Sequence, residues 1–167
     1  MKQIAILYGS SSGNTEAVAR LINTKLGNEA KLIDVAAVNI AELKGFEALI
    51  LGTSTWGLGD LQDDWEDFIP ELEKVDMSGK TVALFGLGDA ESYPDTFVDG
   101  MGTIYDCIVE KGCKIVGQVP AVDYRFEAST ALKDNSLVGL AIDEDNESDK
   151  TNERIESWIN SIKDYLN

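Results

Sequence analysis

Histidine is absent from this sequence, and its absence excludes several kinds of active site. It is the side chain that most often serves as a general base near neutral pH, and it is the commonest metal ligand. A Ser-His-Asp triad is therefore excluded, and hydrolase activity in general is disfavoured.

Cysteine is scarce, since the chain holds only Cys107 and Cys113. Their spacing matches neither a CxxC redox motif nor a zinc-binding pattern, so we expect two ordinary thiols in a reducing compartment. No apolar run approaches the roughly 20 residues of a membrane-spanning helix. The first residues also lack the apolar core and cleavage site of a signal peptide. The sequence therefore predicts a cytoplasmic protein that does not enter the membrane.

Positive charge is also in short supply, because 14 Lys and Arg residues face 30 Asp and Glu residues, for a net charge of −16. Nucleic-acid binding needs the opposite sign and is disfavoured. A strongly negative surface attracts basic protein partners at rates that fall with added salt. The same composition is also typical of a soluble acidic protein without such partners.

Apolar runs typical of strands alternate with amphipathic helical segments along all 167 residues, which favours one domain covering residues 1–167. We expect strands at residues 2–8, 31–35, 47–52, 81–85 and 114–119. We expect helices at residues 14–26, 65–72, 97–108 and 155–162, and a short one capped by Asn39. This alternation predicts an α/β fold with a five-stranded parallel sheet and helices on both faces. A further apolar run at 138–142 follows a polar stretch, so we interpret the fifth strand as split by an inserted loop, residues 121–137.

Ligands of open parallel sheets bind at the carboxyl ends of the strands, where the strand order reverses. The loop after the first expected strand, residues 9–15, carries the hydroxyls of Ser10, Ser12 and Thr15 and leads into a helix. Such hydroxyls and free helix amides form an anion site, although the same residues are ordinary in a helix-capping turn. The chain has neither a Walker A lysine nor a GxGxxG motif, which disfavours nucleoside triphosphates and dinucleotides.

Two further loops each carry an aromatic side chain, Trp56 in residues 53–60 and Tyr93 in residues 86–95. Each ring could instead cover a neighbouring helix. Two aromatic rings beside a phosphate-type loop favour a flat, phosphorylated ligand, and FMN fits that description best. Gly57 would allow its peptide to flip without steric cost, and Asp95 is expected to cap the next helix.

These motifs resemble those of the long-chain flavodoxins, and the resemblance covers essentially the whole chain. SSSGNT resembles the family's T-x-T-G-x-T phosphate loop, and TWGLGD and GLGDAESY resemble the two loops whose aromatic rings stack on the flavin. The loop 121–137 resembles the insertion that distinguishes long-chain members. The resemblance implies a flavodoxin-like three-layer sandwich that binds FMN without a covalent link.

The resemblance also implies roles for individual residues. Trp56 and Tyr93 flank the isoalloxazine ring, Gly57 turns its carbonyl toward flavin N5, and Asp145 lies near the ribityl chain. Gly88 and Asp89 contact the pyrimidine edge, and Val98 stands where some relatives carry a polar side chain. Phosphate contacts are implied for Ser10, Ser11, Ser12, Asn14 and Thr15, and the remaining expected cofactor-binding residues are Gly13, Thr53, Ser54, Thr55 and Gly86.

The resemblance finally implies a low-potential one-electron carrier that cycles chiefly between semiquinone and hydroquinone, and not an enzyme. Its acidic rim would dock the basic faces of reductases and oxidoreductases, and we expect a monomer. An FMN-dependent quinone or nitro reductase on the same fold is an alternative, although rings on both faces leave little room for a substrate. A phospho-accepting receiver domain shares this architecture, but it needs clustered Asp residues at the ends of the first and third strands, and this sequence lacks them there. A binding module without a cofactor fits if the first loop is only a cap.

Overall fold

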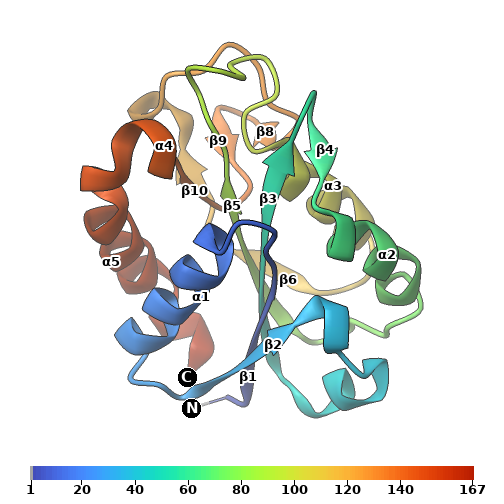
Figure 1. Cartoon of the computed structure of the whole chain (residues 1–167). Helices are drawn as coiled ribbons and strands as arrows, with labels where there is room; N and C mark the ends of the chain where they lie inside the picture. The colour runs from blue at the N-terminus through green and yellow to red at the C-terminus, as the bar shows by residue number, and fades with distance from the viewer. Residues whose placement is uncertain (1) are drawn as a thin grey trace.

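A twisted parallel sheet forms the centre of the computed structural model, which describes residues 2–167 (Figure 1). The strands run in the order β10-β5-β3-β1-β2, with β6 also paired to β5 and β4 paired to β3. All of these pairs are parallel except β3 with β4. The strands of this sheet are β1 (Ile4–Gly9), β2 (Ala30–Asp34), β3 (Ala48–Trp56), β4 (Asp60–Leu61), β5 (Thr81–Leu87), β6 (Lys114–Val116) and β10 (Leu140–Ile142).

Helices cover both faces of the sheet, which confirms the predicted three-layer sandwich. Alternate residues of β1 point to opposite faces, so Ile4 and Ile6 pack with α1 and α5 while Ala5 and Leu7 pack with α2 and α3. Figure 1 shows α1 and α5 on one side and α2 and α3 on the other. The helices are α1 (Asn14–Lys25), α2 (Asp63–Leu72), α3 (Asp99–Ile108), α4 (Glu144–Glu147) and α5 (Thr151–Ile162), with 3₁₀ turns η1 (Val35–Ala37), η2 (Ile40–Gly45), η3 (Ala121–Asp123), η4 (Ser148–Lys150) and η5 (Lys163–Leu166).

The fifth position of the sheet is shared by two short strands, which confirms the predicted split. β6 pairs with residues 81–83 of β5, and β10 pairs with residues 85–87. The chain between them, residues 117–139, is called the insert below. The predicted strand at 114–119 is wrong in its second half, because the main-sheet strand ends at Val116.

The insert is not the plain loop that we expected, because it forms a small antiparallel sheet of its own. β7 (Val119–Pro120) pairs with β9 (Ser136–Leu137), which also pairs with β8 (Leu132–Lys133). The turn between β8 and β9 consists of Asp134 and Asn135, both at positive φ (51° and 68°). Two residues at positive φ are typical of a tight hairpin turn.

Two local expectations differ from the structure. Trp56 ends strand β3 and faces β4 in a hairpin, so the segment 53–60 is largely strand and turn. Asp95 does not cap α3, because that helix begins after Val98 and has no side-chain cap. Pro70 lies inside α2, two residues before the end of the helix, and lacks the backbone N–H of an interior helical residue.

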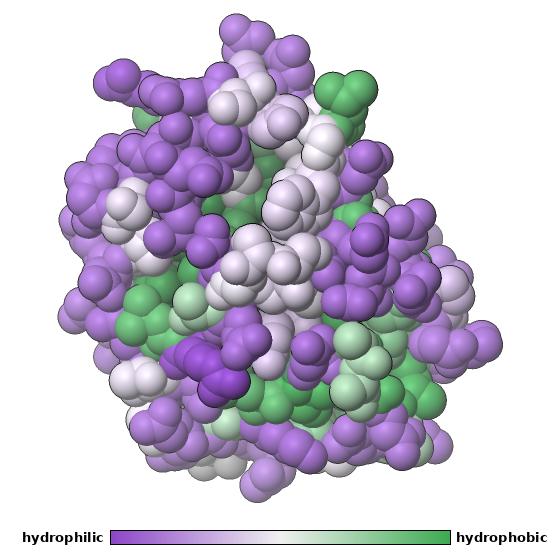
Figure 2. All heavy atoms as spheres, in the orientation of Figure 1, coloured by the Kyte–Doolittle hydropathy of each residue, from purple (hydrophilic) through white to green (hydrophobic). Residues whose placement is uncertain are grey.

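Hydrophilic side chains cover most of the face drawn in Figure 2, with side chains of intermediate hydropathy along its middle. The apolar residues lie mainly in the two layers between sheet and helices. Within residues 2–167, none of the helices combines the length and the apolar character that a bilayer crossing requires.

Candidate functional site

The carboxyl ends of β1, β3 and β5 meet at one edge of the sheet, where the strand order reverses. β1 connects through α1 to β2 on one side, whereas β3 connects through α2 to β5 on the other. Ligands of doubly wound sheets bind at such a switch point. A cavity of about 220 Å³ opens there, and it is lined by Ser12, Asn14, Thr15, Ser54, Thr55, Trp56, Gly57, Leu87, Gly88, Asp89, Tyr93, Glu144 and Asp145.

The loop after β1 presents the amino-terminal end of α1 to this cavity. Gly13 precedes the helix with φ of 94°, a conformation that side-chain-bearing residues rarely adopt. Its amide donates to Ser10 Oγ over 3.0 Å, which closes the loop. No side chain of residues 2–167 caps α1, so its first amides face outward with the positive end of the helix dipole. This arrangement can hold an anion without a basic side chain.

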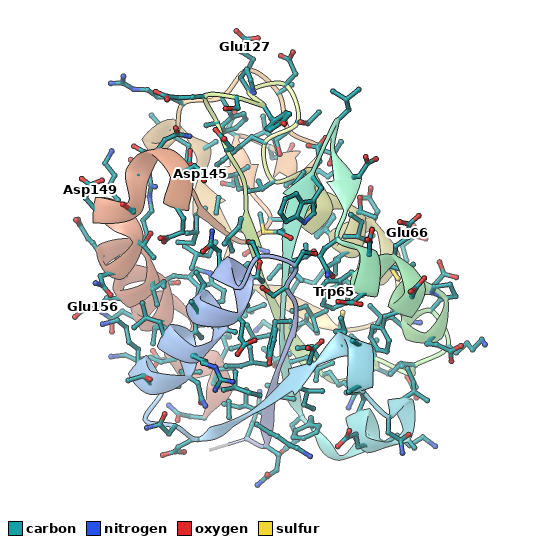
Figure 3. The ribbon with its side chains drawn as sticks, in the orientation of Figure 1. Trp65, Glu66, Glu127, Asp145, Asp149 and Glu156 are labelled. Carbon is teal, nitrogen blue, oxygen red and sulfur yellow. The ribbon has the colours of Figure 1, made fainter. Side chains whose placement is uncertain are left out.

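A buried glutamine that the sequence analysis missed holds this loop by a hydrogen bond from the protein interior. Gln62 is 1% exposed, and its side-chain amide donates to Ser11 Oγ over 3.2 Å. Its oxygen accepts from the amide of Trp65 over 3.2 Å, so Gln62 also caps α2. The ring nitrogen of Trp65, which Figure 3 labels in the interior, donates to the Gly52 carbonyl over 2.7 Å. Position 62 directly precedes a helix, and that was the only available sequence signal.

The hairpin of β3 and β4 carries an exposed aromatic ring at its tip. Trp56 is 43% exposed, and its indole nitrogen donates to Ser54 Oγ over 2.7 Å. This bond satisfies the polar edge of the indole and leaves its faces free for a flat ligand. Gly57 follows with φ of 53°, and a Cβ added there would lie 3.0 Å from Asp60 Oδ2. A larger residue at position 57 would therefore be strained and crowded.

The loop after β5 carries the second ring, Tyr93, which is 46% exposed. A buried carboxylate that the sequence analysis missed holds this loop. Asp143 is 1% exposed and accepts from the amides of Ala90 and Asn146, each over 3.1 Å. The Asn146 side chain in turn donates to Asp89 Oδ1 over 2.9 Å. Residues beyond the split strand therefore position the loop that presents Tyr93.

Carboxylates make the cavity negative along one wall. Burial acts to raise the pKa of Asp89, but hydrogen bonds from Ser92 and Asn146 outweigh it and hold that pKa below its usual value. Burial raises the pKa of Asp145, and the charges of Asp89, Asp143 and Glu144 raise it further. A ligand in this cavity would therefore meet fixed negative charge on the side of these residues.

Some expected cofactor-binding residues lie beside or beneath the cavity and do not line it. Ser10, Ser11 and Gly13 shape the first loop, as described above. Thr53 is fully buried, and Gly86 lies under Met101 of α3. Val98 is likewise fully buried and takes the left-handed conformation, with φ of 49°. The structure adds Leu87 and Glu144 to the lining.

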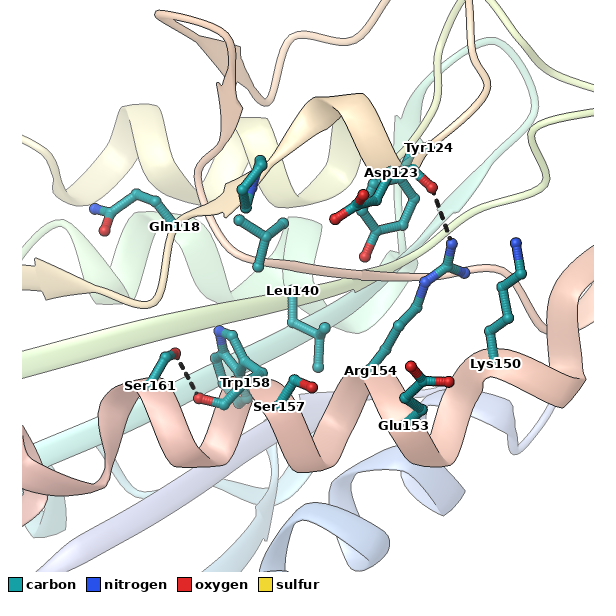
Figure 4. A pocket seen from close by; sticks show the side chains of 12 residues that line it. Gln118, Asp123, Tyr124, Leu140, Lys150, Glu153, Arg154, Ser157, Trp158 and Ser161 are labelled. Atoms are coloured by element: carbon teal, nitrogen blue, oxygen red, sulfur yellow. Dashed lines mark hydrogen bonds between the residues drawn. The ribbon is translucent and has the colours of Figure 1, made fainter.

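A larger cavity, of about 500 Å³, lies elsewhere, between the insert and α5 (Figure 4). Its lining includes two cations, Lys150 and Arg154, and both are paired with Glu147. Arg154 also lies 4.3 Å above the Tyr124 ring and donates to the Asp123 carbonyl. These contacts fasten the insert to α5. Both cations pair with Glu147, although Arg154 Nη1 is buried without a hydrogen-bond partner among the described residues. We place the functional site in the smaller cavity, because that cavity lies at the switch point of the sheet.

The raised pKa of Asp145 predicts a pH-dependent effect of Asp145→Asn. In the unfolded chain this carboxyl has an ordinary pKa of about 3.9, so ionising it in the folded protein costs stability above that pH. We expect the variant to raise the melting temperature of the ligand-free protein by about 1 to 3 °C at pH 7, since the group is exposed. The gain should vanish near pH 3, where both states are protonated. Thermal unfolding at both pH values measures the change in melting temperature.

Asp106→Asn is the control. It removes an exposed charge paired with Lys133 and should not raise the melting temperature. An equal gain for Asp145→Asn at pH 7 and at pH 3 would refute the raised pKa of Asp145.

Known proteins show the same sequence pattern and the same fold. The family model described as "Flavodoxin" matches residues 6–158. The flavodoxin of Klebsiella pneumoniae is 46% identical over an alignment of 168 positions, which covers 99% of this chain and 96% of that protein. Flavodoxin 1 of Escherichia coli K12 is 46% identical over an alignment of 163 positions, which covers 96% of this chain and 93% of that protein. The structure of Fusobacterium nucleatum flavodoxin bound to flavin mononucleotide superposes with a TM-score of 0.94 at 33% identity, and the match covers 100% of both chains. This chain therefore belongs to the flavodoxin family.

Proposed function

We propose that this chain binds FMN without a covalent link and works as a low-potential one-electron carrier rather than as an enzyme. The observation that carries the proposal is the composition of the switch-point cavity. Two exposed aromatic rings, Trp56 and Tyr93, line it together with the amino-terminal end of α1. The family and the related FMN-bound structure support the same assignment.

The residues present fit the phosphate group of FMN. Ser12, Asn14 and Thr15 line the cavity at the start of α1, whose first amides no side chain caps within residues 2–167. The described residues that line this cavity include neither Lys nor Arg. The phosphate would therefore be held by neutral donors and the helix dipole. Glu144 lies near this end of α1, because it also lines a neighbouring cavity together with Asn14, so the neutral donors would hold the phosphate close to a carboxylate.

The residues of the other two loops fit the flavin ring. We propose that Trp56 and Tyr93 flank the ring and exclude water from it, while Gly88 and Asp89 meet its polar edge. When bound, FMN supplies the redox chemistry. The chain would tune that chemistry, because the Gly57 carbonyl can accept a hydrogen bond from a protonated N5 of the flavin. The carboxylates of Asp89 and Asp145 oppose any added negative charge, which lowers the potential.

The proposal also covers the redox partners, the oligomeric state, the cellular compartment and the domain organisation of this chain. An acidic molecule is expected to meet redox partners through their basic faces and to remain a monomer, and Figure 3 shows Glu66, Glu127, Asp149 and Glu156 on different sides of its periphery. Cys107 and Cys113 are free thiols, which supports a reducing compartment such as the cytoplasm. We propose residues 1–167 as one domain, since one sheet contributes to both apolar layers.

Reconstitution with FMN followed by anaerobic reductive titration tests the proposed function. We expect one FMN per chain and two well-separated one-electron steps in the visible spectrum. A single two-electron step, or oxidation of NADH by the protein alone, would instead indicate an FMN-dependent reductase. Failure to take up FMN would indicate a binding module without this cofactor.

The partner proposal predicts a strong dependence of electron transfer on salt. With a basic cytochrome as acceptor, we expect the second-order rate constant to fall by about tenfold or more between low and physiological ionic strength, because salt screens the attraction. Stopped-flow kinetics measures the rate, and a neutral small-molecule acceptor serves as the control. Equal rates at all salt concentrations would contradict the proposed docking.

A further inference from the structure

The insert contacts the chain segment that follows Tyr93 in the second proposed flavin loop. The amides of Glu127 and Ala128 both donate to the Pro94 carbonyl, over 2.8 and 3.0 Å, directly after Tyr93. The amide of Phe97 donates back to the Ala128 carbonyl over 3.2 Å, and the ring of Phe97 stacks on Phe126 at 5.3 Å between centroids. The insert therefore holds residues 94–97, which lead from Tyr93 into α3.

One buried carboxylate continues this contact to the other flavin loop. Asp99 is 9% exposed, and its Oδ1 accepts from the amide of Thr130 in the insert over 2.8 Å. The Thr130 hydroxyl also donates to the Asp99 carbonyl over 3.3 Å. The second carboxylate oxygen lies against the hairpin turn, because a Cβ added at Gly59 would be 2.8 Å from it. Asp99 thus touches the insert with one oxygen and the turn beside Gly57 with the other.

The first turn of α3 fits closely between the insert and the end of β3. The amide of Gly100 donates to Thr55 Oγ1 over 2.9 Å, and a Cβ there would lie 2.7 Å from the Ser54 carbonyl oxygen. On the other side, a Cβ at Gly102 would lie 2.5 Å from Thr130 Oγ1 and 2.8 Å from the amide of Ala131. Movement of the insert would therefore move the helix turn that contacts β3.

We propose that the insert stabilises the conformation of the flavin site. Asp99 is the positioning residue through which the insert holds the turn formed by residues 57–60. The inference rests on the proposed placement of FMN beside Trp56 and Tyr93. The physical reason is that a two-glycine turn at a sheet edge has little structure of its own. Its conformation depends on what packs against it, and here the packing side chain is itself held by an amide of the insert.

Asp99→Ala tests the proposal in the ligand-free protein and in the holoprotein. Without FMN, we expect faster hydrogen exchange at the backbone amides of residues 57–60, because the turn loses its support. FMN affinity should fall about tenfold, as for the loss of a charge-assisted hydrogen bond. Asp99→Asn keeps an acceptor for the Thr130 amide and should restore both properties to within about twofold of the parent protein. Asp106→Asn, which removes an exposed charge from the same helix, should change neither.

Gly102→Ala tests the same connection from the side of the insert, since a Cβ at residue 102 would crowd Thr130 and Ala131. We expect faster exchange at residues 57–60 in this variant as well. Unchanged exchange in both Asp99→Ala and Gly102→Ala would overturn the proposal. An Asp99→Asn variant as defective as Asp99→Ala would also overturn it, because charge and not positioning would then be responsible. If the parent protein failed to bind FMN, the proposed function would fail, whereas the exchange measurements would still report on the contact.

Discussion

Replacing both Trp56 and Tyr93 with alanine is expected to weaken FMN binding by about 100-fold or more. Stacking of a planar base on an aromatic side chain contributes about 1–3 kcal/mol per ring, and a flavin ring offers comparable flat surface. The two side chains are 43% and 46% exposed, so little packing of the folded protein depends on them. We therefore expect the melting temperature of the ligand-free protein to stay nearly constant while the affinity falls.

Titration of ligand-free protein with FMN, followed by the change in flavin fluorescence, measures this effect. Leu58→Ala is the matched control, because Leu58 lies on the same hairpin tip and is 87% exposed. It should bind FMN as the parent protein does. The single variants Trp56→Ala and Tyr93→Ala should each fall between the control and the double variant. A double variant that binds within about threefold of the parent would exclude the two rings as the walls of the flavin site.

Gly57→Val is expected to bring the two one-electron midpoint potentials of the FMN-loaded protein closer together. The residue has φ of 53°, and a Cβ there would lie 3.0 Å from Asp60 Oδ2. A β-branched residue resists this conformation and restricts the peptide movement that would offer the Gly57 carbonyl to the singly reduced cofactor. The combined cost is about 1–2 kcal/mol, which corresponds to roughly 40–90 mV for a one-electron couple.

Spectroelectrochemical titration of the holoprotein measures both potentials. Gly57→Asn is the control, because asparagine tolerates the left-handed conformation better than other side-chain-bearing residues. It should shift the separation of the two potentials by much less than valine does. The same separation in the valine variant and the parent protein would show that the Gly57 peptide does not contribute to the redox properties.

The alternation of strands and helices could be predicted because each element has a local signal. Apolar runs such as residues 47–52 indicated buried strands, and the spacing of Val18, Ile22 and Leu26 indicated an amphipathic helix. Both were confirmed, together with the split of the fifth strand. The small sheet of the insert was missed because its strands have two residues each and no periodicity. The dipeptide Asp134-Asn135 was the one signal for its hairpin, since both residue types tolerate positive φ.

Residues that line the site could be predicted from their positions after strands, but the residues that support them could not. Trp56, Gly57, Asp89 and Tyr93 stand in loops whose composition is unusual enough to be noticed. Gln62 and Asp143 look like ordinary helix-capping residues in the sequence. Gln62 reaches Ser11 across a separation of 51 residues, and Asp143 reaches the amide of Ala90 across 53. No local pattern carries such a contact.

The sequence by itself determined the order of the elements, the chemistry of the loops at the sheet edge and the negative charge of the molecule. Each of these follows from short-range periodicity, turn-forming residues or composition. Only the tertiary structure decided which buried side chains hold those loops, and that the insert contacts the start of α3 through Thr130 and Asp99, 31 residues apart. The physical reason is that a hydrogen bond to a distant amide depends on how the packed layers bring two backbones together. That placement is a property of the whole fold and not of any one segment.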